Sequence, residues 1–115
     1  FTRSAAAIAA YIGLMRAGHV VMPFSPGDAT RARTVGARIG ANAMLRASGR
    51  EHELEWLQRD ELALHPELRL LMSTSGTTGS PKLVKLSRLN LDSNAAAIAS
   101  YLALSPGERA YTTLP

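Results

Sequence analysis

The stretch that most constrains the fold is the polar segment Thr74-Ser-Gly-Thr-Thr-Gly-Ser-Pro-Lys82, which separates two apolar runs of the chain. Its nine residues include two glycines, five hydroxyl side chains, a proline and a lysine. The apolar run before it, Leu68–Ser73, and the run after it, Leu83–Ser87, both predict strands. A connection that only reverses the chain between strands takes about two to five residues. We therefore expect this loop, written with its flank as residues 73–82, to bind something.

The composition of the loop favours an anionic, phosphate-bearing ligand. Glycine allows close approach of the backbone, and successive N–H groups in such a loop converge on an anion. Lys82 adds a full positive charge, which strengthens a hydrogen bond roughly twofold. The spacing differs from the common P-loop, because Gly79 follows Gly76 after two residues and a strand, not a helix, is expected next. A surface hairpin without a ligand is the less favoured alternative.

The nine residues from Thr74 to Lys82 match, without a gap, the phosphate-loop signature of the acyl-adenylate-forming enzymes. This superfamily includes acyl-CoA synthetases, adenylation domains of peptide synthetases, and luciferase. The segment 90–115 resembles the helix and strand that lead to the next motif of the family. The upstream segment also resembles the family, through Gly13, Ala17, Gly18, Pro23 and Pro26.

Three departures from the family pattern leave the subfamily open. Leu83 follows the lysine, where the family often has glycine. Arg88 and Asn90 follow the next strand without the histidine that often precedes them. Met72 and Ser73 precede the loop, where an aromatic residue is frequent.

The resemblance implies an enzyme that activates a carboxylic acid with ATP and Mg²⁺, forming acyl-AMP and pyrophosphate. The acyl group then passes to a thiol, either of coenzyme A or of a carrier-protein phosphopantetheine. The resemblance places the catalytic lysine and the metal ligand outside this segment. The lack of cysteine fits a reducing compartment, and we expect a cytoplasmic enzyme. A carrier-loading adenylation domain and an inactive relative that serves as an interaction module stay open as alternatives. By resemblance, the ATP phosphates are bound by Thr74, Ser75, Gly76, Thr77, Thr78, Gly79, Ser80 and Lys82.

The pattern along the chain predicts an α/β fold, a layered sandwich with a mainly parallel sheet flanked by helices. Helices and short apolar strands alternate, and we expect Leu68–Ser73 to be an inner strand with both faces covered. The polar stretch Ser48–Glu67 is interpreted as a loop with short elements. We expect a helix over Leu91–Leu104, with Ile98, Tyr101 and Leu102 on its buried side. The other expected elements are a helix from the cap Ser4 to about Ala17, a strand at His19–Phe24, a helix carrying Ala32, Val35 and Ile39 after Asp28, a strand at 41–47 and a last strand from Arg109.

Length and composition limit the class of protein further. The 115 residues suffice for one domain or part of a larger one, and we interpret 1–115 as a single segment of an AMP-binding N-terminal domain. The rest of the parent enzyme is then its main partner. The absence of cysteine excludes disulfides and thiolate catalysis. The longest apolar run, Ala5–Met15, is too short to span a bilayer.

Charge suggests two other kinds of site, neither of which is favoured. The net charge is +4, and five arginines in twenty residues resemble a nucleic-acid patch, but no aromatic residues interleave with them for base stacking. His52 and His65 lie among glutamates without the spacing of metal ligands. We therefore expect neither nucleic-acid nor metal binding here, and His19 and Trp56 are interpreted as structural. The five arginines are Arg31, Arg33, Arg38, Arg46 and Arg50.

Overall fold

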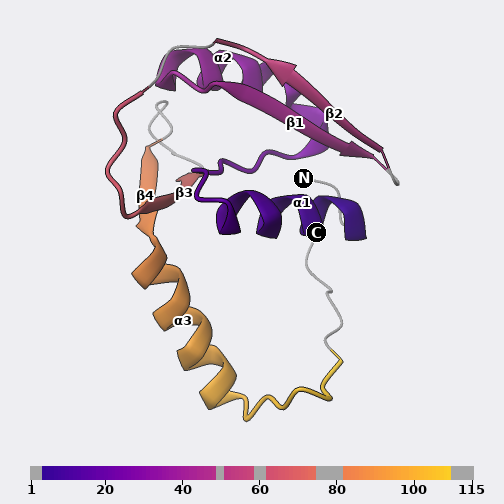
Figure 1. Ribbon diagram of the computed structural model, residues 1–115, viewed down its shortest axis with the longest axis vertical. Coiled ribbons are helices and arrows are strands. Elements are labelled where there is room, and N and C mark those ends of the chain that lie inside the picture. Colours follow the sequence, from indigo (N-terminus) through magenta and orange to yellow (C-terminus); the bar gives the residue numbers. More distant parts are fainter. Residues whose placement is uncertain (1–3, 49–50, 59–61, 75–81, 110–115) are drawn as a thin grey trace.

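A computed structural model describes residues 4–48, 51–58, 62–74 and 82–109, and shows an α/β chain (Figure 1). Its described strands form two separate two-stranded antiparallel sheets, β1–β2 and β3–β4. The expected α/β class is therefore confirmed. In chain order the elements are α1 (Ala5–Arg16), a 3-10 turn (Pro26–Asp28), α2 (Ala29–Ile39), β1 (Ala43–Ser48), β2 (Glu51–Trp56), β3 (Leu68–Ser73), β4 (Leu83–Ser87) and α3 (Arg88–Tyr101).

The helix α1 begins and ends where the sequence predicts, and α2 begins after Asp28 as expected. The hydroxyl of Ser4 caps α1 by accepting a hydrogen bond from the backbone N–H of Ala7 at 3.1 Å. Gly18 follows α1 with a φ of 87°, and Gly40 ends α2 with a φ of 71°. Both values lie in the left-handed region that glycine adopts without steric cost.

The strand β3 is paired along both of its edges. On one side it forms the antiparallel hairpin with β4, and on the other Val21 makes an isolated parallel bridge to Leu70. The bridge consists of two hydrogen bonds of 2.9 Å, from Val21 N to the Arg69 carbonyl and from Leu71 N to the Val21 carbonyl. Leu70 is only 6% exposed at this junction. The bridge is the one parallel pairing in the described part of the chain, so a mainly parallel sheet stays a prediction.

The interpretation of Ser48–Glu67 as a loop with short elements did not identify the strand β2 within it. The sequence Glu51–Trp56 alternates glutamate with His52, Leu54 and Trp56, and this period of two is typical of a strand. It pairs with β1 in a continuous antiparallel register, in which Leu45 lies opposite Leu54. The high charge of the segment obscured the alternation.

The helix α3 differs from its prediction in its start and in its burial. It begins at Arg88 rather than Leu91, because Ser87 caps it from the end of β4. The expected buried side is wrong for the described chain, since Ile98 is 48% exposed, Tyr101 88% and Leu102 56%. The helix extends away from the other elements, so no other described element covers it along its length (Figure 1).

Candidate phosphate-binding loop

The β3–β4 hairpin closes at the two residues that begin and end the predicted phosphate loop. The backbone N–H of Thr74 donates to the Lys82 carbonyl at 2.9 Å, and the Thr74 hydroxyl donates to the same oxygen at 3.3 Å. The hairpin register pairs Met72 with Val84 and Ser73 with Leu83, so Thr74 and Lys82 continue the ladder by one step. The two ends of the loop are therefore fixed next to each other, and both residues are exposed.

The ladder also determines which side of the hairpin Thr74 and Lys82 share. Alternate residues of a strand lie on one face, so both share the face of Met72 and Val84. Lys85 belongs to the opposite face, with Leu71 as its cross-strand partner. A cationic side chain and a hydroxyl thus lie together at the end of the hairpin. Because the N–H and the hydroxyl of Thr74 both donate to the Lys82 carbonyl, the feature of this end that suits an anion is the positive charge of Lys82.

Most of the predicted site residues lie outside the described residues. Of the eight residues predicted to contact ATP phosphates, the structure describes Thr74 and Lys82 and brings them together. The strand expected after the loop, β4, is confirmed. The remaining six, outside the described part of the chain, are Ser75, Gly76, Thr77, Thr78, Gly79 and Ser80.

The residues just after β4 have structural roles that sequence reasoning missed. Ser87 and Asn90 form a capping box, in which the Ser87 hydroxyl accepts from the Asn90 N–H at 3.1 Å and the Asn90 side-chain oxygen accepts from the Ser87 N–H at 3.0 Å. Arg88 pairs with Asp92 one turn later, at 3.3 Å. The Ser-x-x-Asn spacing in the sequence could have predicted this capping box. The box joins the β3–β4 hairpin directly to α3.

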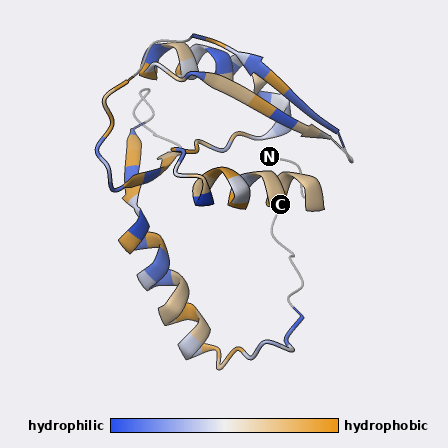
Figure 2. Cartoon of the chain, in the orientation of Figure 1, coloured by the Kyte–Doolittle hydropathy of each residue, from blue (hydrophilic) through white to orange (hydrophobic). Residues whose placement is uncertain are grey.

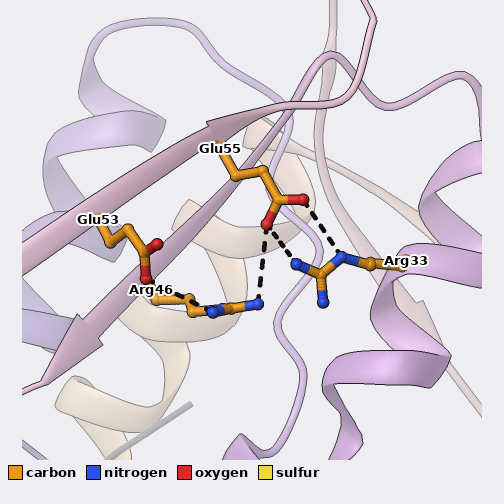
Figure 3. Close-up of polar contacts among 4 residues, drawn as sticks. All are labelled: Arg33, Arg46, Glu53 and Glu55. Atoms are coloured by element: carbon orange, nitrogen blue, oxygen red, sulfur yellow. Dashed lines mark hydrogen bonds and ion pairs between the residues drawn. The ribbon is translucent and has the colours of Figure 1, made fainter.

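The arginines of the predicted patch are partly neutralised by glutamates of β2 (Figure 3). Arg33 of α2 binds Glu55 through two contacts, Nε to Oε1 at 3.2 Å and Nη2 to Oε2 at 2.6 Å. Arg46 of β1 contacts Glu53 at 3.4 Å and Glu55 at 3.7 Å. These pairs tie α2 to the β1–β2 hairpin and reduce the positive charge available to a nucleic acid. Arg31 and Arg38 are exposed on α2, and Arg50 lies outside the described residues.

The two histidines of the polar stretch have separate environments. The Nε2 atom of His52 lies 3.4 Å from the carbonyl oxygen of Ala6 in α1. The His65 ring accepts a hydrogen bond from the Glu67 N–H at 3.2 Å. No group of three metal-ligating side chains occurs among the described residues. Within the same residues, no helix has the length and apolar character that crossing a membrane requires.

A comparison with curated proteins finds a partial relative. The chain is similar to a sulfoacetate–CoA ligase of Cupriavidus necator, with 48% identity over 46 residues. The matched part is 40% of this chain but only 9% of the ligase. No family model and no solved structure matches the chain. The similarity supports a relationship to CoA ligases at the level of the superfamily.

Proposed function

We propose that this chain is the ATP-binding part of an AMP-forming acid–thiol ligase. The observation that carries the proposal is the hairpin that closes at Thr74 and Lys82, the first and last residues of the acyl-adenylate signature. The partial similarity to a CoA ligase also supports it. Residues 1–115 would then be a segment of an AMP-binding N-terminal domain, with a mainly parallel sheet completed by the rest of the parent enzyme.

The chemistry assigned to the loop is retention of the leaving group. When a carboxylate attacks the α-phosphate of ATP, negative charge grows on the departing pyrophosphate. Lys82, together with the hydroxyls and N–H groups between Thr74 and Gly79, would hold the β- and γ-phosphates. Neither Thr74 nor Lys82, the two residues at which the hairpin closes, has a carboxylate side chain. The ligands of Mg²⁺ are therefore proposed to lie in the remainder of the enzyme. When bound, the metal supplies further charge neutralisation.

The acid substrate and the thiol acceptor are proposals about the whole enzyme. The relative is named for ligation of sulfoacetate to coenzyme A, so small sulfonated or short carboxylic acids are the first to test. Coenzyme A is the proposed acceptor for the same reason. A carrier-protein phosphopantetheine is the alternative, which applies if the full-length protein loads a carrier.

The experiment is an acid-dependent ATP–pyrophosphate exchange assay on the full-length protein that contains this sequence. We expect exchange of labelled pyrophosphate into ATP only when a suitable carboxylic acid is present, and AMP rather than ADP when a thiol is added. Coenzyme A and a phosphopantetheine carrier are supplied in separate reactions. Formation of ADP would contradict the proposal in favour of another class of ATP-using enzyme. A folded protein that binds no ATP and consumes none with any acid would indicate an inactive relative.

A further inference from the structure

Thr74, which follows β3, uses both of its hydrogen-bond donors within the hairpin. Its backbone N–H donates to the Lys82 carbonyl at 2.9 Å, and its hydroxyl donates to the same oxygen at 3.3 Å. A carbonyl oxygen has two lone pairs, so it can accept both hydrogen bonds. A threonine has no other N–H or O–H group. While the hairpin is closed in this way, Thr74 therefore has no donor left for a ligand.

A polyphosphate needs donors, because its ionised oxygens accept hydrogen bonds and do not donate them. The ammonium group of Lys82 has three N–H donors and a full charge, and the residue is exposed. The Thr74 hydroxyl has a single O–H, which the Lys82 carbonyl already accepts. Of the two residues at which the hairpin closes, Lys82 is thus the one equipped to contact a phosphate.

The neighbouring pair on the same face offers the Thr74 hydroxyl no competing partner. That pair is Met72 and Val84, which are 42% and 40% exposed. Figure 2 shows β4 coloured mostly as hydrophobic. Valine has no polar side-chain atom, and the thioether of methionine is only a weak acceptor. The branched Cβ of threonine also restricts χ1, which helps to keep the hydroxyl on the Lys82 carbonyl.

The second hydrogen bond on this carbonyl affects the orientation of Lys82. The carbonyl belongs to the peptide group between Lys82 and Leu83, at the end of the ladder, where backbone pairing opens most easily. Two donors hold that peptide group more firmly than one. The Cα–Cβ bond of Lys82 then keeps one direction relative to the hairpin, and only the side-chain torsions stay free. Such ordering before binding lowers the entropic cost of binding a ligand.

We infer that Thr74 is a positioning residue: its hydroxyl holds the Lys82 backbone and acts on the phosphates of ATP only through the Lys82 ammonium. The inference rests on the proposed function, since it concerns the same site. It gives Thr74 a role that differs from the direct phosphate contact implied by the family resemblance.

The first test measures the hydrogen bond itself in the full-length protein without ATP. Thr74→Val keeps the shape of the side chain and removes the hydroxyl, whereas Thr74→Ser keeps the hydroxyl. We expect hydrogen exchange of the amide at position 74, corrected for its intrinsic rate, to be about two- to tenfold faster in Thr74→Val and within about twofold of wild type in Thr74→Ser. Thr74→Ala replaces Thr74→Val if the latter does not fold.

The matched control is Thr34, an exposed threonine of α2 whose hydroxyl donates to the Thr30 carbonyl at 3.1 Å. Thr34→Val removes the same kind of hydrogen bond at a place outside the hairpin. It should leave both the exchange of the amide at position 74 and the affinity for ATP unchanged.

The second test is a double-mutant cycle on ATP affinity with Thr74→Val and Lys82→Ala. Lys82→Ala keeps the backbone carbonyl but removes the ammonium group. We expect Thr74→Val to weaken ATP binding about two- to tenfold when Lys82 is present, and by less than about twofold in the Lys82→Ala protein. A hydroxyl that contacts phosphate directly would cause the same loss in both backgrounds.

The two readouts separate this inference from the proposed function. Unchanged exchange in Thr74→Val overturns the inference, and so does an equal loss of ATP affinity with and without the Lys82 side chain. A folded wild-type protein that binds no ATP contradicts the proposed function instead. In that case the exchange rates still decide whether the Thr74 hydroxyl holds the Lys82 backbone.

Discussion

Glu55 is the residue whose loss is expected to loosen the contact between α2 and the β1–β2 hairpin. It accepts two hydrogen bonds from Arg33, of 3.2 and 2.6 Å, and lies 3.7 Å from a guanidinium nitrogen of Arg46. The three side chains are between 35% and 46% exposed, so solvent screens each pair. Exposed ion pairs contribute about 0.2–1 kcal/mol each, with two-point contacts at the upper end. We therefore expect Glu55→Gln to cost about 1 kcal/mol.

The assay is native-state hydrogen exchange of the β1 and β2 amides, which reports the free energy of local opening. A double-mutant cycle of Glu55→Gln and Arg33→Gln should give a coupling energy of about 0.5–1 kcal/mol at low salt. At 1 M salt the Debye length is about 3 Å, so the coupling should fall by at least about half.

The matched control is the Arg88–Asp92 pair within α3, which is 3.3 Å long and 74% and 68% exposed. A pair one turn apart on a helix contributes about 0.3–0.5 kcal/mol at most. The reasoning is refuted if the Arg33–Glu55 coupling is no larger than that of the control. It is refuted equally if 1 M salt leaves the coupling unchanged.

Four further substitutions test the local structure. Gly13→Ala should raise the free energy of unfolding by about 0.5–1 kcal/mol, because its helical site has open space. Gly40→Ala should lower it by about 1–2 kcal/mol, since the φ of Gly40 is 71° and a new Cβ would lie 3.1 Å from Leu62; thermal melts check both. Ser87→Ala should speed hydrogen exchange in the first turn of α3 by roughly fivefold, for a loss of about 1 kcal/mol of capping; an unchanged rate would show that the box is dispensable. Burial raises the pKa of the Tyr11 phenol above its ordinary 10.0, so its effect on stability is complete below that pH and is lost as the pH rises through the folded pKa. Tyr11→Phe should flatten the alkaline unfolding curve accordingly.

Local signals in the sequence predicted both ends of α1, the start of α2 and the strand–loop–strand order of the site. The Ser4 cap acts through a hydrogen bond to the backbone and Gly18 through its freedom to take a positive φ, and both effects lie within one turn of chain. The hairpin was predictable because a polar, glycine-rich segment separates two apolar runs. Its closure, from the Thr74 N–H to the Lys82 carbonyl, required the strand register and was seen only in the structure.

The predictions that failed concern contacts between different elements of the chain. Ile98 and Leu102 have helical apolar spacing, but spacing does not specify the partner, and the described chain offers none. The strand β2 was missed because three glutamates dominate its composition, although two of them are paired with arginines across the sheet and from α2. The parallel contact of Val21 with β3 joins residues far apart in sequence, and local patterns do not encode it.

The central claim is that the loop holds the triphosphate of ATP. The most direct test is to measure the ATP affinity of two variants of the full-length protein, Lys82→Ala and Lys85→Ala. Both lysines are exposed on β4 or at its start, but only Lys82 shares the loop end with Thr74. Loss of one charge-assisted hydrogen bond is worth about 1.5–3 kcal/mol, or roughly ten- to a hundredfold in Kd. We predict such a loss for Lys82→Ala, an affinity within about twofold of wild type for Lys85→Ala, and the same melting temperature for both. Wild-type ATP affinity in a folded Lys82→Ala protein would contradict the assignment of the loop as the ATP site.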